Sequence, residues 1–287
     1  MAILMPGAPV AEALGERICA GVAQLKTHFI TPTVAIVRVG ERAPDLSYER
    51  GFTKKAESLG IQVVKKVFPV EVTETELLDA LNRINQDQYI HGCLLFRPLP
   101  PHLNTQAVLS ALRPEKDIDA MTGASMGALI TQDEHGFPPC TAKACIEILD
   151  HYNVPVKGKN VVMVGSGMAV GMPLSIMLIN RGATVSVCHI FSDPQRVKEL
   201  CRQADIIISA AGKAGLITKE HIAPGQVIVD VGINMGPDGK LCGDVDFAAA
   251  EPVVAAITPV PKGVGAVTST VLASHVVEAA LKANHLQ

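Results

Sequence analysis

The stretch VVMVGSGMAVGMP, residues 161–173, decides the fold, because an apolar strand runs directly into a glycine-rich turn and then into a helix. Gly165 would permit a tight turn, Gly167 would let the backbone approach a ligand, and the N–H groups that open the helix would face its negative charge. The spacing Gly-x-Gly-x-x-x-Gly, which ends at Gly171, is one residue longer than the usual fingerprint and is by itself a weak signal. We predict that this turn binds the pyrophosphate of a dinucleotide rather than serving as a plain strand-turn-helix connection.

Strand-like runs alternate with helical segments on both sides of this turn. After it come TVSVCH (184–189), DIIISAAG (205–212) and QVIVDVG (226–232), as a parallel doubly wound sheet requires. Before it, apolar runs at 33–39, 61–70 and 91–96 follow an amphipathic helix at 9–26 and are separated by helices at about 46–59 and 74–85. Thr73 or Thr75 would cap the helix at 74–85. The pattern predicts an α/β fold in both halves of the chain.

Length and composition favour two domains. A chain of 287 residues with 48% hydrophobic residues can bury two cores. We expect an N-terminal domain at 1–140 and a Rossmann-type domain at 141–267, with a last helix at about 268–284 that packs back onto the first domain. His275 on that helix is expected to be a packed residue rather than a catalyst.

Charge and cysteine usage exclude several classes of protein. The net charge is −3 with no basic stripe, which argues against a nucleic-acid partner. We find no export signal and no apolar run of membrane-spanning length, so we expect a cytoplasmic protein without a membrane partner. The seven cysteines form no Cys-x-x-Cys pair and are expected to be reduced and mostly buried, and the nine histidines show no metal-ligand spacing, so no bound metal is expected.

Several separated segments carry a more specific signal. They are SYERGFTKKAESLGI (47–61), RPLPP (97–101), PEKDIDAMT (114–122), PCTAKA (139–144), the glycine turn, DVGIN (230–234) and TPVPKGVGAVT (258–268). Together and in this order they resemble the methylenetetrahydrofolate dehydrogenase/cyclohydrolase (FolD) family. The resemblance implies an N-terminal folate-side domain, a C-terminal NAD(P)-binding Rossmann domain, an active site in the cleft between them, and a homodimer. It also implies tetrahydrofolate as the one-carbon carrier.

The resemblance assigns roles to residues of the folate site. Tyr48 matches the tyrosine that lies against the aminobenzoyl portion of the folate, although alone it would be taken as a half-buried tyrosine at a helix start. Asp119 matches the aspartate that binds the pterin, since a carboxylate accepts from an amino group and a ring N–H. Asp117 is expected to cap or pair locally. The further substrate-binding residues implied are Pro98, Leu99 and Pro100 in a rigid loop, and Gly263 and Gly265 where backbone approaches ligand.

Two positions depart from the family pattern. Where the family has a lysine four residues after the tyrosine, this chain has Phe52, and where the family has a glutamine before its Leu-Pro-Leu-Pro run, this chain has Phe96. In the family the lysine and glutamine chiefly serve the cyclohydrolase step, in which protons must be moved. We therefore expect a dehydrogenase that oxidises 5,10-methylenetetrahydrofolate to 5,10-methenyltetrahydrofolate, with weak or absent cyclohydrolase activity. Hydride removal needs no proton transfer by a side chain, because the folate nitrogens stabilise the developing cation and the nicotinamide accepts the hydride.

Three other interpretations stay open. Lys54 or Lys55 could replace the missing lysine and keep both activities; Lys55 returns to the helical face of Tyr48, although about 10 Å further along. The chain could instead be a non-catalytic folate- or nucleotide-binding homologue. It could also be another amino- or hydroxy-acid dehydrogenase that uses the same Rossmann half.

The dinucleotide is expected to lie along Gly165, Ser166, Gly167, Gly171 and Ile233, the last by its match to the family's DVGI segment. The choice between NADP and NAD stays open, because the family's Gly-Arg-Ser turn has become Gly165-Ser166-Gly167. An acidic residue near the end of the next strand favours NAD and an arginine favours NADP. Asp193 and Arg196 are the candidates for these two roles.

Overall fold

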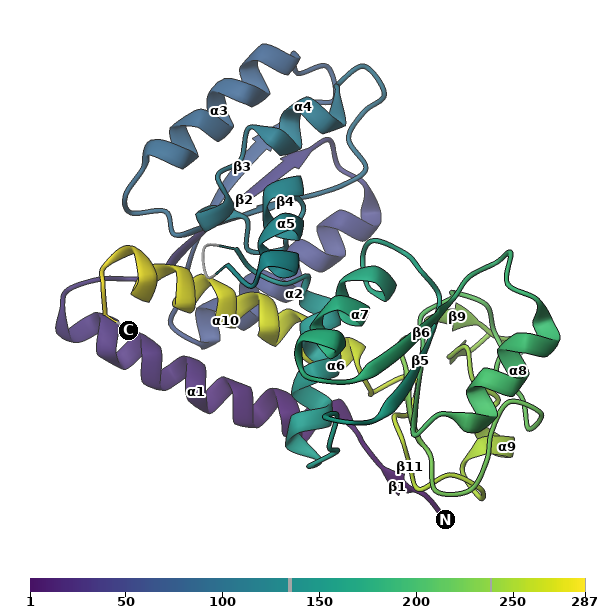
Figure 1. The fold of residues 1–287 in the computed structure, drawn as a ribbon. Coiled ribbons are helices and arrows are strands. Elements are labelled where there is room, and N and C mark those ends of the chain that lie inside the picture. Colours follow the sequence, from purple (N-terminus) through teal and green to yellow (C-terminus); the bar gives the residue numbers. More distant parts are fainter. Residues whose placement is uncertain (134–135, 238, 287) are drawn as a thin grey trace. The chain divides into compact units, whose positions relative to one another are not determined.

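The computed structural model describes residues 1–133, 136–237 and 239–286, which form two compact units (Figure 1). Unit 1 consists of Met1–Glu12 and Thr141–Thr268, and unit 2 consists of Ala13–Cys140 and Ser269–Gln287. Within the described residues, no helix combines the length and the hydropathy that a bilayer-spanning segment needs.

Unit 1 is built on a parallel sheet. Its strands in spatial order are β1 (Ile3–Leu4), β11 (Ala256–Ile257), β8 (Val227–Asp230), β7 (Ile206–Ser209), β5 (Asn160–Val164) and β6 (Thr184–Cys188). All neighbouring pairs are parallel. The predicted doubly wound sheet is therefore confirmed, and its three predicted later strands are present, each slightly shorter than its apolar run.

Helices cover both faces of this sheet. They are α6 (Cys140–His151), α7 (Gly171–Asn180), α8 (Pro194–Gln203) and α9 (Phe247–Ala250), with a small antiparallel hairpin of β9 (Asn234–Met235) and β10 (Leu241–Cys242). Val162 and Ile207 pack with Cys201 of α8 and Ala250 of α9, while α7 lies against the other face (Figure 1). The chain leaves β5 for β6 on one side and returns to β7 on the other. Such a reversal leaves a crevice at the carboxyl ends of the strands, where doubly wound sheets bind ligands.

Unit 2 has a smaller parallel sheet of β3 (Gln62–Phe68), β2 (Thr33–Val39) and β4 (Gly92–Leu95), in that order. Its helical segments are α1 (Gly7–Thr27), α2 (Ala43–Ser58), α3 (Glu74–Gln86), α4 (Thr105–Ser110), a 3₁₀ turn at Pro114–Lys116, α5 (Gly123–Thr131) and α10 (Gly265–Ala283). Helices α1 and α10 both start in unit 1. Thr73 caps α3: the Glu76 N–H donates to Thr73 Oγ1 (3.3 Å) and the Thr73 N–H donates to Glu76 Oε2 (2.9 Å). This capping box settles the choice between Thr73 and Thr75.

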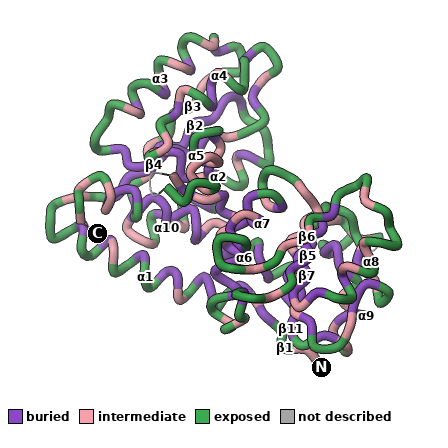
Figure 2. The backbone as a smooth tube through the Cα atoms, in the orientation of Figure 1, coloured by how far each residue is buried: buried purple, intermediate pink, exposed green. Residues whose placement is uncertain are grey.

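The cores lie along the strands. Strands β2, β4 and β7 are buried along their whole length, whereas exposed residues gather on the helices and loops (Figure 2). Alternate residues of β2 and β4 face α3 and α4, because Val37 and Leu95 pack with Leu81 and Val108. All seven cysteines are free thiols and five of them are buried, as expected from the sequence.

Candidate functional site

Tyr48 lies between two phenylalanine rings in unit 2. The ring of Phe52, one turn later in α2, is nearly parallel to it at a centroid distance of 6.5 Å, and the ring of Phe96 meets it edge-on at 5.9 Å. Phe96 directly follows β4, and its N–H donates to Val37 O (3.0 Å). Phe52 is 1% exposed and Tyr48 is 41% exposed. Phe52 therefore belongs to the core, whereas the tyrosine offers an accessible face to a ligand.

A buried ion cluster holds α2 on the sheet beside Tyr48. Glu49 accepts from Arg38 Nε of β2 (2.9 Å) and pairs with Lys65 Nζ of β3 (2.9 Å). Although burial opposes it, the hydrogen bonds from Lys65 and Arg38 lower the pKa of Glu49. The carboxylate is thus ionised and ties the helix that carries Tyr48 to two strands.

The two aspartates of the segment Asp117-Ile118-Asp119 have different surroundings. Asp117 is fully buried and accepts from the backbone N–H groups of Met121 (2.9 Å) and Thr122 (2.8 Å) and from Ser125 Oγ (2.6 Å). It therefore organises the start of α5. The expectation that Asp117 caps or pairs locally is confirmed.

Asp119 shares an electrostatic neighbourhood with Tyr48. Burial raises the pKa of the Asp119 carboxyl, and a hydrogen bond from the Cys140 thiol and the charge of Arg97 only partly offset this. Burial, followed by the charge of Asp119, raises the pKa of Tyr48 far above its ordinary value. Tyr48 is therefore a phenol at neutral pH. The structure brings Tyr48, Phe96, Arg97 and Asp119 together at one place in unit 2.

Cys140, which the sequence analysis did not single out, lies behind Asp119. Burial raises the pKa of its thiol well above the ordinary value, so it stays protonated. Its Sγ lies 3.7 Å from Nδ1 of His275, and that nitrogen donates to Ile118 O (2.8 Å). His275 also packs against Phe137 with ring centroids 5.0 Å apart. The expectation that His275 is a packed residue is confirmed, and Cys140 supports the segment that carries Asp119.

The remaining candidates of unit 2 occupy varied positions. Pro98 is exposed, Pro100 is partly exposed, and Leu99 is buried in the hydrophobic core, so the side chain of Leu99 is turned away from solvent. On α2, Lys54 is exposed and Lys55 partly exposed, and neither forms an ion pair with any residue that the structure describes. The cation whose charge acts on Asp119 is Arg97.

A cavity of about 1180 Å³ lies elsewhere in unit 2. Its lining includes Thr33 and Gln62, the first residues of β2 and β3, so it is at the amino ends of the strands, and Tyr48, Phe96 and Asp119 lie outside it. The candidate site is at the opposite, carboxyl end of β4.

The glycine turn of unit 1 has the packing that its sequence predicts. Gly165 has φ +114°, and a Cβ there would lie 2.4 Å from Ala210 O. A Cβ on Gly171 would lie 1.9 Å from Gly165 O, so both positions require glycine. A Cβ on Gly167 would meet nothing within 4 Å, and Gly167 and Met168 are exposed. The first and last glycines close the turn, and the middle one faces open space next to the start of α7, where the sequence predicts the pyrophosphate.

A buried carboxylate holds the loops next to this turn. Asp244 is fully buried; its Oδ2 accepts from Ala211 N (2.7 Å), Gly212 N (3.2 Å) and Ser209 Oγ (3.1 Å), and its Oδ1 accepts from Lys213 N (2.9 Å) and Asn234 Nδ2 (3.0 Å). In the described part of the chain no cationic side chain pairs with it. Asp244 therefore ties the loop after β7 to the loop after β8 at the carboxyl edge of the sheet.

Asp230 supports the same edge from the end of β8. It accepts from the N–H groups of Gly232 (3.0 Å), Asp244 (3.0 Å) and Val245 (3.0 Å). Burial, together with the charge of Asp244, outweighs these hydrogen bonds and raises the pKa of Asp230 to about 6. Ile233 follows and is 64% exposed. Neither aspartate was predicted as a functional residue, because the only signal in the sequence is that each stands near a glycine, at DVG and GDV.

Gly263 and Gly265 belong to unit 1. A Cβ on Gly263 would lie 2.4 Å from Pro259 O, so this glycine is required by its own turn. Gly265 begins α10, and a Cβ there would lie 3.8 Å from Cδ1 of Ile233. The structure thus brings Gly265 next to the candidate nucleotide-binding Ile233.

Comparison with known proteins agrees with this geometry. The tetrahydrofolate dehydrogenase/cyclohydrolase catalytic domain matches residues 5–119, and the NAD(P)-binding domain of the same family matches residues 139–284. The bifunctional protein FolD of Carboxydothermus hydrogenoformans is 44% identical over 281 residues, 97% of each chain.

Solved structures of relatives have the same fold. The bifunctional enzyme FolD of Campylobacter jejuni matches with a TM-score of 0.93 and 35% identity, over 98% of this chain and 99% of that one. The FolD of Trypanosoma brucei, solved with NADP cofactor and an inhibitor, matches with a TM-score of 0.89 and 33% identity, over 98% of both chains. The chain belongs to the tetrahydrofolate dehydrogenase/cyclohydrolase family and carries that family's NAD(P)-binding domain.

Proposed function

We propose that this chain is a methylenetetrahydrofolate dehydrogenase, dependent on NAD or NADP, whose cyclohydrolase activity is weak or absent. The observation that carries the second part is the packing of Phe52 and Phe96 around Tyr48. These phenylalanines stand where the family pattern has its lysine and glutamine. The proposal keeps the homodimeric state and the cytoplasmic location that the sequence analysis expects.

The dehydrogenase step needs mainly binding and orientation from this chain. When bound along the glycine turn, the nicotinamide supplies the hydride acceptor. Tyr48 would stack against the aminobenzoyl ring, and Asp119 would accept from the amino group and ring N–H of the pterin. As the hydride leaves the methylene carbon with the electron pair of its C–H bond, the two folate nitrogens stabilise the resulting cation. No side chain has to move a proton in this step.

The cyclohydrolase step asks for more. Water must add to the methenyl carbon and lose a proton to a base. One C–N bond then breaks, and the nitrogen that leaves must gain a proton. Phenyl rings accept and donate no protons, and the guanidinium of Arg97 does not act as a base. The high pKa of Tyr48 keeps its hydroxyl protonated. Of the two carboxylates near Tyr48, Glu49 is held by Arg38 and Lys65, and the proposal assigns Asp119 to the pterin.

The competing proposal is a bifunctional enzyme in which Lys54 or Lys55 takes the place of the missing lysine. Lys55 is the better candidate, because it lies seven residues after Tyr48 and returns to the same face of α2. Phe52, however, lies between them on that face and is fully buried. The bifunctional alternative predicts that the protein hydrolyses methenyltetrahydrofolate without any change to Phe52.

A double substitution separates the two proposals. We expect the wild type to hydrolyse supplied methenyltetrahydrofolate at no more than the spontaneous rate. Phe52→Lys with Phe96→Gln restores groups that can manage protons and is expected to accelerate hydrolysis by about 10²-fold over that rate. Phe52→Leu with Phe96→Leu is the matched control, which changes both rings without adding a polar group. Rapid hydrolysis by the wild type would instead support the bifunctional enzyme.

A further inference from the structure

We propose that the chain binds NAD in preference to NADP, and that the loop at residues 189–194, between β6 and α8, sets this preference. The inference rests on the proposed function in one respect, namely that the dinucleotide lies along the glycine turn. In such a sheet the ribose of the adenosine lies beside the end of the strand that follows the turn. Here that strand is β6, which neighbours β5 and leads into this loop.

The backbone of the loop is fixed by its own hydrogen bonds. The Ser192 N–H donates to His189 O (2.9 Å), and the His189 N–H donates to Ser192 Oγ (3.0 Å). The Phe191 N–H donates to Nδ1 of the His189 ring (3.1 Å). The ring of His189 is thus held by the backbone of its own loop.

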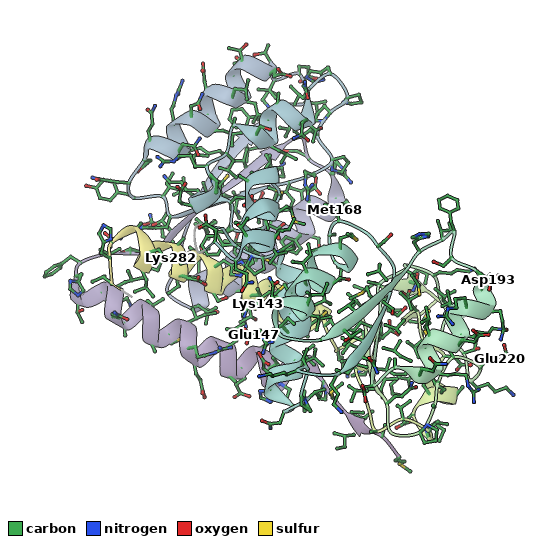
Figure 3. The ribbon with its side chains drawn as sticks, viewed as in Figure 1. Lys143, Glu147, Met168, Asp193, Glu220 and Lys282 are labelled. Atoms are coloured by element: carbon green, nitrogen blue, oxygen red, sulfur yellow. The ribbon has the colours of Figure 1, made fainter. Side chains whose placement is uncertain are left out.

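The side chains that this loop presents suit a ribose diol better than a phosphate. Ile190 and Phe191 are 91% and 90% exposed, and neither can donate to a phosphate oxygen. Asp193 lies at the start of α8 (Figure 3). Its Oδ1 accepts from the Arg196 N–H (2.8 Å), which fixes the carboxylate in place. Among described residues Oδ2 has no hydrogen-bond partner, so it can accept from a ribose hydroxyl. The same carboxylate would repel a phosphate, which carries close to two negative charges at neutral pH.

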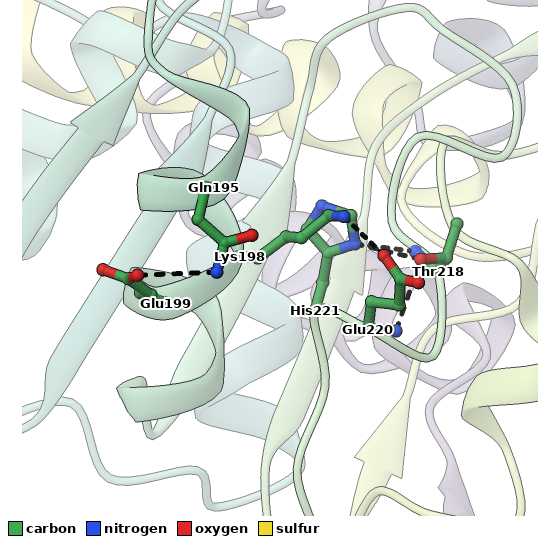
Figure 4. A network of polar contacts seen from close by, with 6 residues as sticks. All are labelled: Gln195, Lys198, Glu199, Thr218, Glu220 and His221. Carbon is green, nitrogen blue, oxygen red and sulfur yellow. Dashed lines mark hydrogen bonds and ion pairs between the residues drawn. The ribbon is translucent and has the colours of Figure 1, made fainter.

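The nearby cations are engaged elsewhere. Arg196 Nη1 pairs with Glu199 Oε2 (3.3 Å). Lys198 of α8 pairs with Glu220, and Gln195 donates to Glu199 (Figure 4). Lys213 follows β7, and β5 lies between β7 and β6. At the usual strand spacing, β7 and β6 are about 9 to 10 Å apart. In the parts of the chain that the structure describes, no unpaired cation belongs to the loop at 189–194. A 2′-phosphate would therefore meet the Asp193 carboxylate, and Arg196, whose charge reaches Cys188 at the end of β6, is shared with Glu199.

Equilibrium binding tests this inference without folate. Purified protein is titrated with NADH and with NADPH, and binding is followed by the fluorescence of the nicotinamide. We expect NADH to bind about tenfold more tightly than NADPH, the difference that one lost charge-assisted contact produces. Ile190→Arg should shift the ratio of the two dissociation constants towards NADPH by about tenfold, and Asp193→Asn, which keeps the cap of α8, should shift it in the same direction.

The control is Ile179→Arg, the same substitution at another exposed isoleucine, at the end of α7. It adds an equal charge away from the loop and should leave the ratio as in the wild type. Tighter or equal binding of NADPH by the wild type, or equal ratios for Ile190→Arg and Ile179→Arg, would overturn the inference. Its failure is distinct from that of the proposed function: a protein that oxidises methylenetetrahydrofolate but binds NADPH at least as tightly as NADH overturns only the preference. Selective NADH binding without any folate oxidation overturns only the proposed function.

Discussion

Asp119→Asn is expected to lower kcat/KM for methylenetetrahydrofolate by about 100-fold, while the free energy of unfolding stays close to that of the wild type. The carboxylate accepts two hydrogen bonds from the pterin in the proposed complex, and charge-assisted hydrogen bonds contribute about 1.5–3 kcal/mol each. An asparagine keeps the shape but turns an N–H group towards a pterin N–H. Because burial raises the pKa of Asp119, its ionisation does not stabilise the fold, and the neutral amide removes no stabilising charge.

Asp117→Asn provides the matched comparison two residues away. Asp117 accepts from two backbone N–H groups and a serine hydroxyl, so its replacement should lower the free energy of unfolding by about 2 kcal/mol. Steady-state kinetics and denaturant unfolding of both variants check the pair. If Asp119→Asn kept wild-type kinetics, or lost stability as Asp117→Asn is expected to, Asp119 would not be the pterin anchor.

Asp244→Asn should weaken nucleotide binding by tenfold or more and lower the free energy of unfolding by about 3 kcal/mol. The carboxylate has two acceptor oxygens for these donors, whereas an asparagine has only one. The N–H₂ group that replaces the other oxygen cannot accept, so the backbone N–H groups that face it lose their hydrogen bonds. The loops after β7 and β8 would then separate. Ile233, which the proposed function places against the dinucleotide, lies on one of these loops.

We expect Asp244 to act on the nucleotide through these loops, as a positioning residue, so a loss of stability alone would not prove this role. The decisive readout is the dissociation constant of the nucleotide, measured at a temperature at which the variant is fully folded. Asp246→Asn is the control, since Asp246 is exposed and caps α9, a position that asparagine fills equally well. An Asp244→Asn protein with wild-type nucleotide affinity when folded would contradict the positioning role.

Much of the fold was predictable, because apolar runs and turn residues in the local sequence indicate where strands, turns and helices lie. The apolar run at 33–39 coincides with β2, and the glycine turn stands between β5 and α7 as predicted. Strand β1 was not predictable, because Ile3–Leu4 is too short to show any periodicity and is a strand only through its pairing with β11. Tertiary contact, and not the local sequence, creates such an element.

The candidate site divides in the same way. Tyr48 and Asp119 were predicted because their segments resemble a known family, whereas the effect of the Asp119 charge on Tyr48 is visible only in the structure. The contacts of Tyr48 with Phe52 and Phe96 join a helix to a distant strand end, which no spacing rule predicts. Asp244 and Cys140 were missed for a related reason. The role of a buried carboxylate or thiol depends on hydrogen-bond partners that lie far away in the sequence, so the local sequence does not predict it.

The central claim is that this chain forms the methenyl product and does not hydrolyse it. The most direct test is to incubate the wild-type protein with methylenetetrahydrofolate and NAD or NADP, and to quantify reduced nucleotide, methenyltetrahydrofolate and formyltetrahydrofolate separately over time. The account predicts one methenyl product for each reduced nucleotide, disappearing afterwards only at the rate measured without protein. Formyltetrahydrofolate that appears in step with the reduced nucleotide, or no reduced nucleotide at all, would contradict it.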